Sequence, residues 1–157
     1  MKKYLAIFLS LVLIFSLVAC APEDKDNDTS DPGASSGDTG DGDVIKIGVF
    51  LPLTGESAGG GELEKLGIDL AHELYPEVLG KKIELVVADN KSDKAESASA
   101  AARLIEKDKV VAILGSYGSS FSMAAGPVVE KAKIPAVSTS ATNPQVTLGN
   151  DYYFRTF

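Results

Sequence analysis

Apolar and polar residues alternate in blocks between residues 44 and 157, and the blocks predict strands and helices in turn. An apolar run rich in β-branched residues, 44–51, ends at Pro52 and predicts a strand. Shorter apolar runs at 83–88, 110–114 and 136–138 predict three more, and 152–156 is compatible with a fifth.

Three helices are predicted between these strands. The first ends at Pro76 and is defined by residues at three- and four-residue spacing: Leu63, Leu66, Gly67, Leu70, Ala71 and Leu74. The second opens at a capping box formed by Asp93 and Glu96. Its small residues share one face: Ala98, Ala101, Ala102 and Ile105. The third is predicted from about Ser119 to Ala132, with Pro127 kinking or restarting it.

Alternating strands and helices, with strands apolar on both faces, indicate an α/β fold: a parallel sheet covered by helices on both faces. Ligands of such sheets bind outside the carboxyl ends of the strands, where the strand order reverses. The loops expected at those ends are 52–61, 89–93, 116–120 and 139–143. The last two are rich in hydroxyl groups and carry no charge, so they are the candidate binding loops.

The N-terminus has the pattern of an export signal. Lys2 and Lys3 precede an apolar run, 4–19, that is shorter than the about 20 residues that cross a bilayer. A permanent membrane helix is the alternative. The sole cysteine, Cys20, follows Leu-Val-Ala, and these four residues resemble the bacterial lipobox. That resemblance implies cleavage of a lipoprotein signal peptide, 1–20, and lipidation of Cys20, which would hold the protein at a membrane surface.

Composition separates a linker from a domain. Residues 21–43 lack large apolar side chains and hold eight acids against one lysine, so we expect a disordered acidic tether. Residues 44–157 hold 14 acids and 12 bases and form the expected folded domain. A nearly neutral domain without a basic patch argues against nucleic acid as a partner.

Enzyme motifs find little support. Gly55-Glu56-Ser57-Ala58-Gly59 matches the G-x-S-x-G pattern of hydrolases, but the only histidine is His72, on the helix that follows. A secreted hydrolase is therefore a distant alternative, and we predict no catalytic residues. The glycines fit no nucleotide-binding loop, and one Cys and one His make a poor metal site, so neither cofactor nor metal is expected.

The hydroxyl-rich loops suit anion binding instead. Ser119 and Ser120 fall at the expected start of a helix, where free backbone N–H groups and hydroxyls can bind a carboxylate. A plain N-cap role for one of these serines is the alternative. Ser138 to Thr142 adds further donors and acceptors at the end of the neighbouring strand.

Four segments carry a family resemblance. Residues 44–55 (VIKIGVFLPLTG) resemble the opening of the type I periplasmic binding proteins of the branched-chain amino-acid receptor family. Residues 113–120 (ILGSYGSS), 134–144 (IPAVSTSATNP) and 153–157 (YFRTF) resemble three later segments of that family, in the same order.

The resemblance implies a two-lobed, hinged receptor that captures an amino acid or similar small zwitterion outside the cell for the permease of an ABC importer. A sensor of the same fold that feeds a signalling protein is the alternative. Amides, urea and aromatic acids are also ligands in this family. Its members run to more than twice this length, so we expect 44–157 to be a truncated first lobe.

By position, the resemblance gives Ser120, Ser140 and Thr142 contacts with the ligand's carboxylate and ammonium groups. The candidate ligand-binding residues are Ser119, Ser120, Ser140, Ala141 and Thr142. Where many relatives carry an aromatic residue near the ligand, this chain has Gly59-Gly60-Gly61.

Overall fold

The structure is a computed structural model that describes residues 44–156. The predicted signal peptide (1–20), the lipidation site at Cys20 and the tether (21–43) lie outside the described residues. Within 44–156, no helix has both the length and the apolar character needed to cross a membrane.

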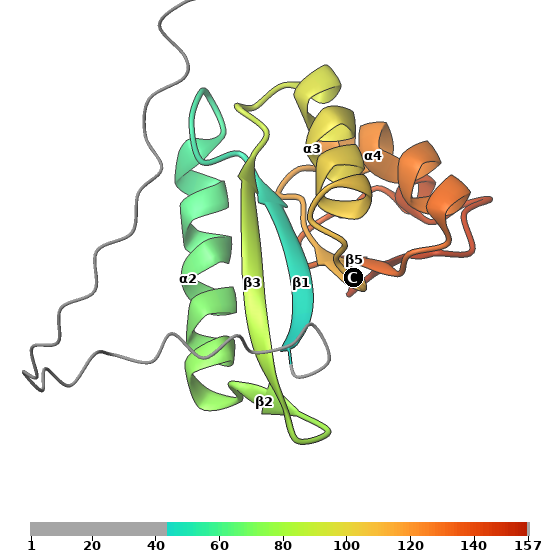
Figure 1. Ribbon diagram of the computed structural model, residues 1–157. Helices are drawn as coiled ribbons and strands as arrows, with labels where there is room; N and C mark the ends of the chain where they lie inside the picture. The colour runs from blue at the N-terminus through green and yellow to red at the C-terminus, as the bar shows by residue number, and fades with distance from the viewer. Residues whose placement is uncertain (1–43, 157) are drawn as a thin grey trace, which may run out of the picture. The chain divides into compact units, whose positions relative to one another are not determined.

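A six-stranded sheet forms the centre of the fold, in the order β2-β3-β1-β4-β5-β6 (Figure 1). Its strands are β1 Val44–Leu51, β2 Glu77–Val78, β3 Lys81–Asp89, β4 Ala112–Leu114, β5 Ala136–Ser138 and β6 Tyr153–Arg155. All neighbouring strands pair in parallel except β2, which pairs antiparallel with β3 at the sheet edge. The predicted strands are present, and β2 is an addition that the sequence pattern did not indicate.

The described residues contain three α-helices: α2 Ala58–Leu74, α3 Lys94–Glu106 and α4 Ser119–Ala132. A short 3₁₀ helix, η1 Pro144–Val146, follows β5. Helix α2 lies on one face of the sheet, and α3 and α4 lie together on the other (Figure 1). The predicted α/β architecture, a mostly parallel sheet with helices on both faces, is therefore confirmed.

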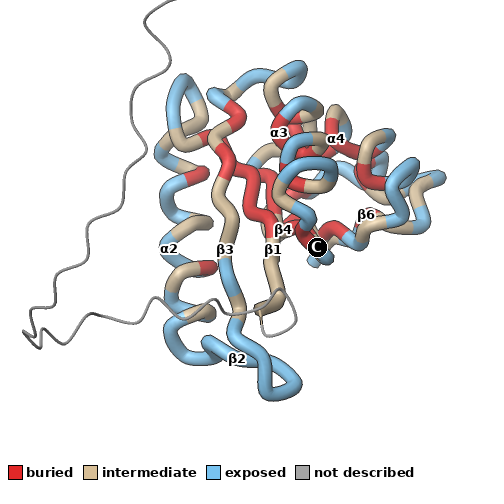
Figure 2. The backbone as a smooth tube through the Cα atoms, viewed as in Figure 1, coloured by how far each residue is buried: buried red, intermediate tan, exposed pale blue. Residues whose placement is uncertain are grey.

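Most buried apolar residues lie between the sheet and the α3–α4 layer (Figure 2). Leu104 of α3 is fully buried, and its Cδ1 lies 3.0 Å from the position that a Cβ on Gly48 of β1 would take. This close approach corrects the predicted inner face of α3. The helix buries Ser97, Ala100, Ala101 and Leu104, because the large Leu104 fills the space over Gly48, whereas Ala98, Ala102 and Ile105 are only partly buried.

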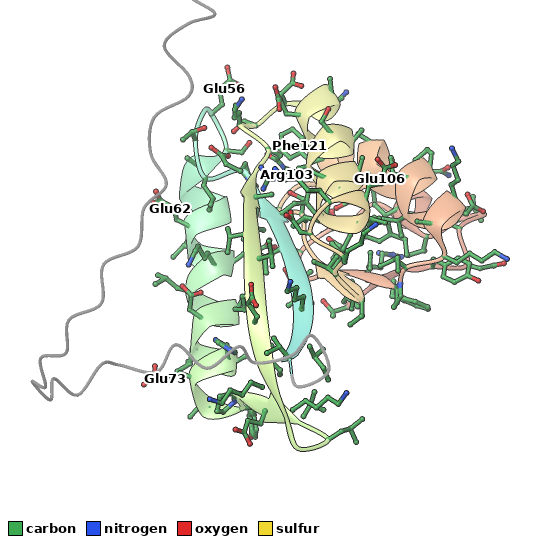
Figure 3. The ribbon with its side chains drawn as sticks, viewed as in Figure 1. Glu56, Glu62, Glu73, Arg103, Glu106 and Phe121 are labelled. Carbon is green, nitrogen blue, oxygen red and sulfur yellow. The ribbon has the colours of Figure 1, made fainter. Side chains whose placement is uncertain are left out.

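The opposite face is thinly covered. Its buried apolar residues are Val49 and Leu51 of β1 and Ile68 of α2. The leucine spacing correctly predicted helix α2, but Leu63, Leu66, Leu70 and Leu74 are 71%, 65%, 56% and 63% exposed. Glutamates of α2 such as Glu62 and Glu73 point away from the sheet (Figure 3). Helix α2 therefore touches the sheet through few residues and leaves its leucines accessible.

Candidate ligand-binding site

The order of the strands places a crevice beside β1. From β1 the chain moves to β3 on one side and then returns to β4 on the other, so the direction of winding reverses between β1 and β4. Parallel sheets bind ligands outside the carboxyl ends of the strands at such a point. The loops there are 52–57 after β1 and 115–118 after β4, with the loop after β5 next to them.

A buried polar network joins the loops after β4 and β5 to the loop after β3. Asn90 Nδ2 donates to Ser116 Oγ (2.9 Å), and the Ser116 N–H donates to Ser122 Oγ (3.2 Å). Ser138 Oγ donates to the Ser116 carbonyl (3.2 Å) and accepts from the Ala141 N–H (3.2 Å). The side chains of this network are fully buried, so their hydrogen bonds are protected from competition with water. The network fixes the loops after β3, β4 and β5 relative to one another.

No sequence pattern singled out Asn90, Ser116 or Ser122. In the sequence, Asn90 and Ser116 are small polar residues that closely follow apolar strands, and Ser122 lies in the first turn of the helix that comes after. A polar residue at such a place is also compatible with an ordinary turn, so the sequence alone did not separate an organising residue from a loop residue.

Asp89 ties the loop after β1 to the end of β3. Its carboxylate accepts hydrogen bonds from Thr54 Oγ1 (2.7 Å) and from the backbone N–H groups of Leu53 (2.9 Å) and Lys91 (2.7 Å). Partial burial on its own would raise the pKa of Asp89, but these hydrogen bonds outweigh it and lower the pKa. Asp89 is therefore ionised at neutral pH and holds the rim of the crevice in place.

The start of α4 faces the crevice without a side-chain cap. The cap position is Gly118, with φ +88°, so the alternative that Ser119 or Ser120 is the N-cap is wrong. Ser119 and Ser120 are instead the first two helical residues, whose N–H groups have no acceptor within a helix. Ser119 Oγ accepts a hydrogen bond from the Asn143 N–H (3.1 Å), which connects α4 to the loop after β5.

The loop after β5 supplies the other predicted residues. Ala141 is buried, Thr142 is exposed, and the Thr142 carbonyl accepts a hydrogen bond from Arg155 Nη1 (3.1 Å). Ser140 Oγ is buried and has no hydrogen-bond partner among the described residues. The structure thus joins Ser119 to the loop after β5 through Asn143, the residue that follows Thr142.

Ser140 also borders a groove of about 580 Å³ between α2 and the sheet. The groove is mainly apolar, with Ile68, Leu85 and Leu114 among its lining residues, and Glu64 also lines it. Both carboxylate oxygens of Glu64 are buried and have no hydrogen-bond partner within residues 44–156. A buried carboxylate without a donor is costly, so this end of the groove is suited to a partner that donates hydrogen bonds.

The distance between Ser57 and His72 argues against the hydrolase alternative. Ser57 precedes the first turn of α2 and His72 lies in its last turn, 15 residues later, so a helical rise separates them by roughly 22 Å. His72 Nε2 lies 2.9 Å from the Ile83 carbonyl oxygen. The described residues also contain no cluster of three His, Cys, Asp or Glu side chains that could hold a metal ion.

Known proteins are similar to this chain in sequence and in fold. The family described as "Periplasmic binding protein" matches residues 44–157. An amino acid binding protein of Pseudomonas aeruginosa is 38% identical over 108 residues, which are 67% of this chain and 29% of that protein.

Two solved structures are similar to the described fold. A leucine-binding protein of Thermotoga maritima has 46% identity and a TM-score of 0.70, over 71% of this chain and 32% of that one. A solute-binding protein of an ABC transporter from Rhodopseudomonas palustris, in complex with 3,4-dihydroxybenzoic acid, has 31% identity and a TM-score of 0.69, over 72% and 31%. The chain therefore spans about a third of the length of the relatives that it matches, and it belongs to the periplasmic binding protein family.

Proposed function

We propose that this chain provides the first lobe of an extracytoplasmic receptor that captures an amino acid or a similar small carboxylate for an ABC importer. The observation that carries the proposal is the uncapped start of α4, where Ser119 accepts a hydrogen bond from Asn143 of the loop after β5, next to the point where the strand order reverses. The relatives that bind amino acids and an aromatic acid support the same ligand class.

The ligand carboxylate would accept hydrogen bonds from the N–H and hydroxyl groups of Ser119 and Ser120, where the helix dipole adds about 0.3–1 kcal/mol. The carbonyl oxygen of Ser140 and the hydroxyl of Thr142 would accept from the ammonium group. Hydrogen bonds to a charged group contribute about 1.5–3 kcal/mol each. Because association costs about 4 kcal/mol or more, we expect this lobe alone to bind no more tightly than roughly millimolar.

Amide chemical shifts of the whole chain, measured during titration with L-leucine at up to saturating concentration, test the site. We expect the largest changes at residues 119–120 and 140–142. Ser120→Ala and Thr142→Ala should each weaken binding about ten-fold or more, because each removes a hydrogen bond to a charged group.

Ser57→Ala and His72→Ala are the matched controls, since Ser57 directly precedes α2 and His72 lies on it, both outside these loops. They should leave the affinity nearly unchanged. Shifts confined to other loops, or normal binding by the Ser120 and Thr142 variants, would show that the site lies elsewhere.

The membrane anchor is a separate part of the proposal. A lipid on Cys20 would keep the receptor beside the permease, and Leu-Val-Ala before Cys20 supports such a modification. Cells fed a labelled fatty acid should incorporate it into the protein, and Cys20→Ala should abolish the label. Unlabelled wild-type protein would exclude lipidation and leave the ligand site unaffected.

A further inference from the structure

The hairpin of β2 and β3 ends in a two-residue turn, Leu79 and Gly80, between the paired residues Val78 and Lys81. Both turn residues have positive φ, +53° for Leu79 and +73° for Gly80, which is the pattern of a type I′ turn. Asparagine, aspartate and glycine favour this conformation, whereas the Cβ of a leucine disfavours it. Leu79 is also 91% exposed. Neither the turn nor the core therefore accounts for a leucine at this position.

Three more large apolar side chains are exposed beside Leu79. Leu74 and Tyr75, at the C-terminal end of α2, are 63% and 73% exposed, and Val78 of β2 is 43% exposed. The end of α2 and β2 lie at the same end of the domain (Figure 1). Single exposed apolar residues are normal on a protein surface, but a group of them marks an interaction site. Leu74, Tyr75, Val78 and Leu79 are called the apolar end below.

The charges around the turn are compatible with a lipid surface. Residues 77–82 contain Lys81 and Lys82 against Glu77, a net charge of +1, and all three side chains are exposed. Glu73 and Glu84 lie further from the turn, on α2 and β3. Leucine and tyrosine side chains enter the headgroup region of a bilayer, and lysines next to them contact lipid phosphates. The apolar side chains would therefore provide most of such a contact.

The chain enters the domain at this same end. Strand β1 begins at Val44, which is in register with Lys82, two residues after Gly80. Residues 21–43 therefore join the domain beside the hairpin, and a lipid on Cys20 would tether this end of the domain to the bilayer. A chain of that length spans at most about 80 Å. Because the tether keeps the bilayer within reach, even a weak contact between domain and lipid is populated.

The ligand crevice lies at the opposite end of the sheet. Strand β1 runs through eight residues from Val44 to Leu51, which is about 26 Å at 3.3 Å per residue. The loops after β1, β4 and β5 follow the carboxyl ends of parallel strands, whereas the hairpin turn precedes the start of β3. A contact through the apolar end would therefore direct the crevice away from the bilayer, into the solution from which a ligand arrives.

We propose that the apolar end is a membrane-contact site, whose side chains enter the headgroup region of the bilayer that anchors the protein. Leu79 at the tip makes the deepest contact. The proposal rests on the membrane anchor in the proposed function and adds to it the surface of the domain that touches lipid. Because only a few side chains enter the bilayer, the contact orients a domain that is already anchored.

Paramagnetic relaxation measures which end of the domain faces the lipid. The whole chain is reconstituted with nanodiscs of phosphatidylcholine and phosphatidylglycerol that contain a lipid with a gadolinium chelate on its headgroup. We expect the loss of amide signal to be largest at residues 74–82 and smallest in the loops 115–118 and 139–143. Equal losses at the two ends, or larger losses at the crevice, would overturn the proposal.

Leu79→Asn is the test variant, because asparagine favours positive φ and keeps the turn while it removes the apolar side chain. Loss of a leucine contact should lower the ratio of docked to undocked domain by about ten-fold or more, and the signal losses at residues 74–82 should shrink accordingly. Leu66→Gln is the matched control: Leu66 is 65% exposed on α2, and glutamine favours a helix. Its signal losses should equal those of the wild type. If both variants reduce the losses equally, the contact is not specific to the hairpin and the proposal is wrong.

The fatty-acid label on Cys20 separates this inference from the anchor. If the protein is labelled and the signals of residues 74–82 are not attenuated, the anchor is correct and the contact site is wrong. If the protein is unlabelled and shows no attenuation, both are wrong. Attenuation at residues 74–82 that Leu79→Asn removes supports the contact site, whether or not Cys20 carries the label.

Discussion

The two faces of the sheet are built from similar side chains and differ greatly in how far they bury them. Between the sheet and α3–α4, residues such as Leu104, Val129 and Tyr153 are almost completely buried. On the α2 face, Ile68 is buried, whereas Leu66 and Leu70 remain more than half exposed. Figure 2 shows the contrast as a continuous buried region on one side and scattered buried residues along α2.

This difference divides the described residues into a framework side, which is the sheet with α3 and α4, and an open side, which is the sheet face covered by α2. The hydrogen-bonded network on the framework side consists of residues at the ends of β3, β4 and β5 and in the first turn of α4: Asn90, Ser116, Ser138 and Ser122. The proposed carboxylate site stands on that framework. Helix α2 lines the groove and carries Glu64, so the groove belongs to the less tightly packed side.

The largest effect is expected from truncation of the framework. Leu104→Ala removes a fully buried side chain that packs over Gly48, and it should lower the free energy of unfolding by about 2–5 kcal/mol. Leu66→Ala, on the open side, removes a side chain that is 65% exposed and should change stability by less than about 0.5 kcal/mol. Denaturant titrations of both variants measure the difference, and equal losses would refute the division into two sides.

The comparison also explains how far the sequence could predict this fold. Strand and helix identities followed from hydrophobic periodicity, and the first and last residues of α4 were predicted correctly. The exposed leucines of α2 were not foreseen, because the spacing of Leu63, Leu66, Leu70 and Leu74 shows that they share a helix face and does not show what covers it. Burial depends on the neighbouring element, which a one-dimensional pattern does not contain.

The candidate site divides in a similar way. The closeness of Ser119 to the loop after β5 could be predicted from the sequence, because loops at the ends of adjacent parallel strands must be neighbours. The close packing of the Tyr117 ring on Gly60 could not be predicted, since it joins a loop to a helix 57 positions away and depends on the absence of a side chain at Gly60. The glycine run 59–61 was visible in the sequence, but what occupied the space above it was not.

An intermediate effect is expected from two glycines of α2. A Cβ on Gly61 would lie 2.1 Å from the Pro52 carbonyl oxygen, so Gly61→Ala forces the helix away from the loop after β1 and should cost about 1–3 kcal/mol. A Cβ on Gly67 would meet nothing within 4 Å, and Gly67→Ala should stabilise the chain by about 0.5–1 kcal/mol, since alanine restricts the unfolded chain and favours helix. Thermal unfolding of the pair measures both signs. Loss of stability in Gly67→Ala would mean that α2 is packed there after all.

The smallest effect should come from the caps of the helices on the two sides. Helix α3, on the framework side, begins at Asp93, whose carboxylate accepts a hydrogen bond from the Glu96 N–H (2.9 Å). Asp93→Ala should therefore cost about 1 kcal/mol. Helix α2 begins at Ser57, which makes no side-chain cap, so Ser57→Ala should cost only a few tenths of that. Urea titrations resolve such a difference when the two slopes are equal. An equal loss in both variants would show that Ser57 caps α2 in solution and that the N-terminus of α2 is stabilised as strongly as that of α3.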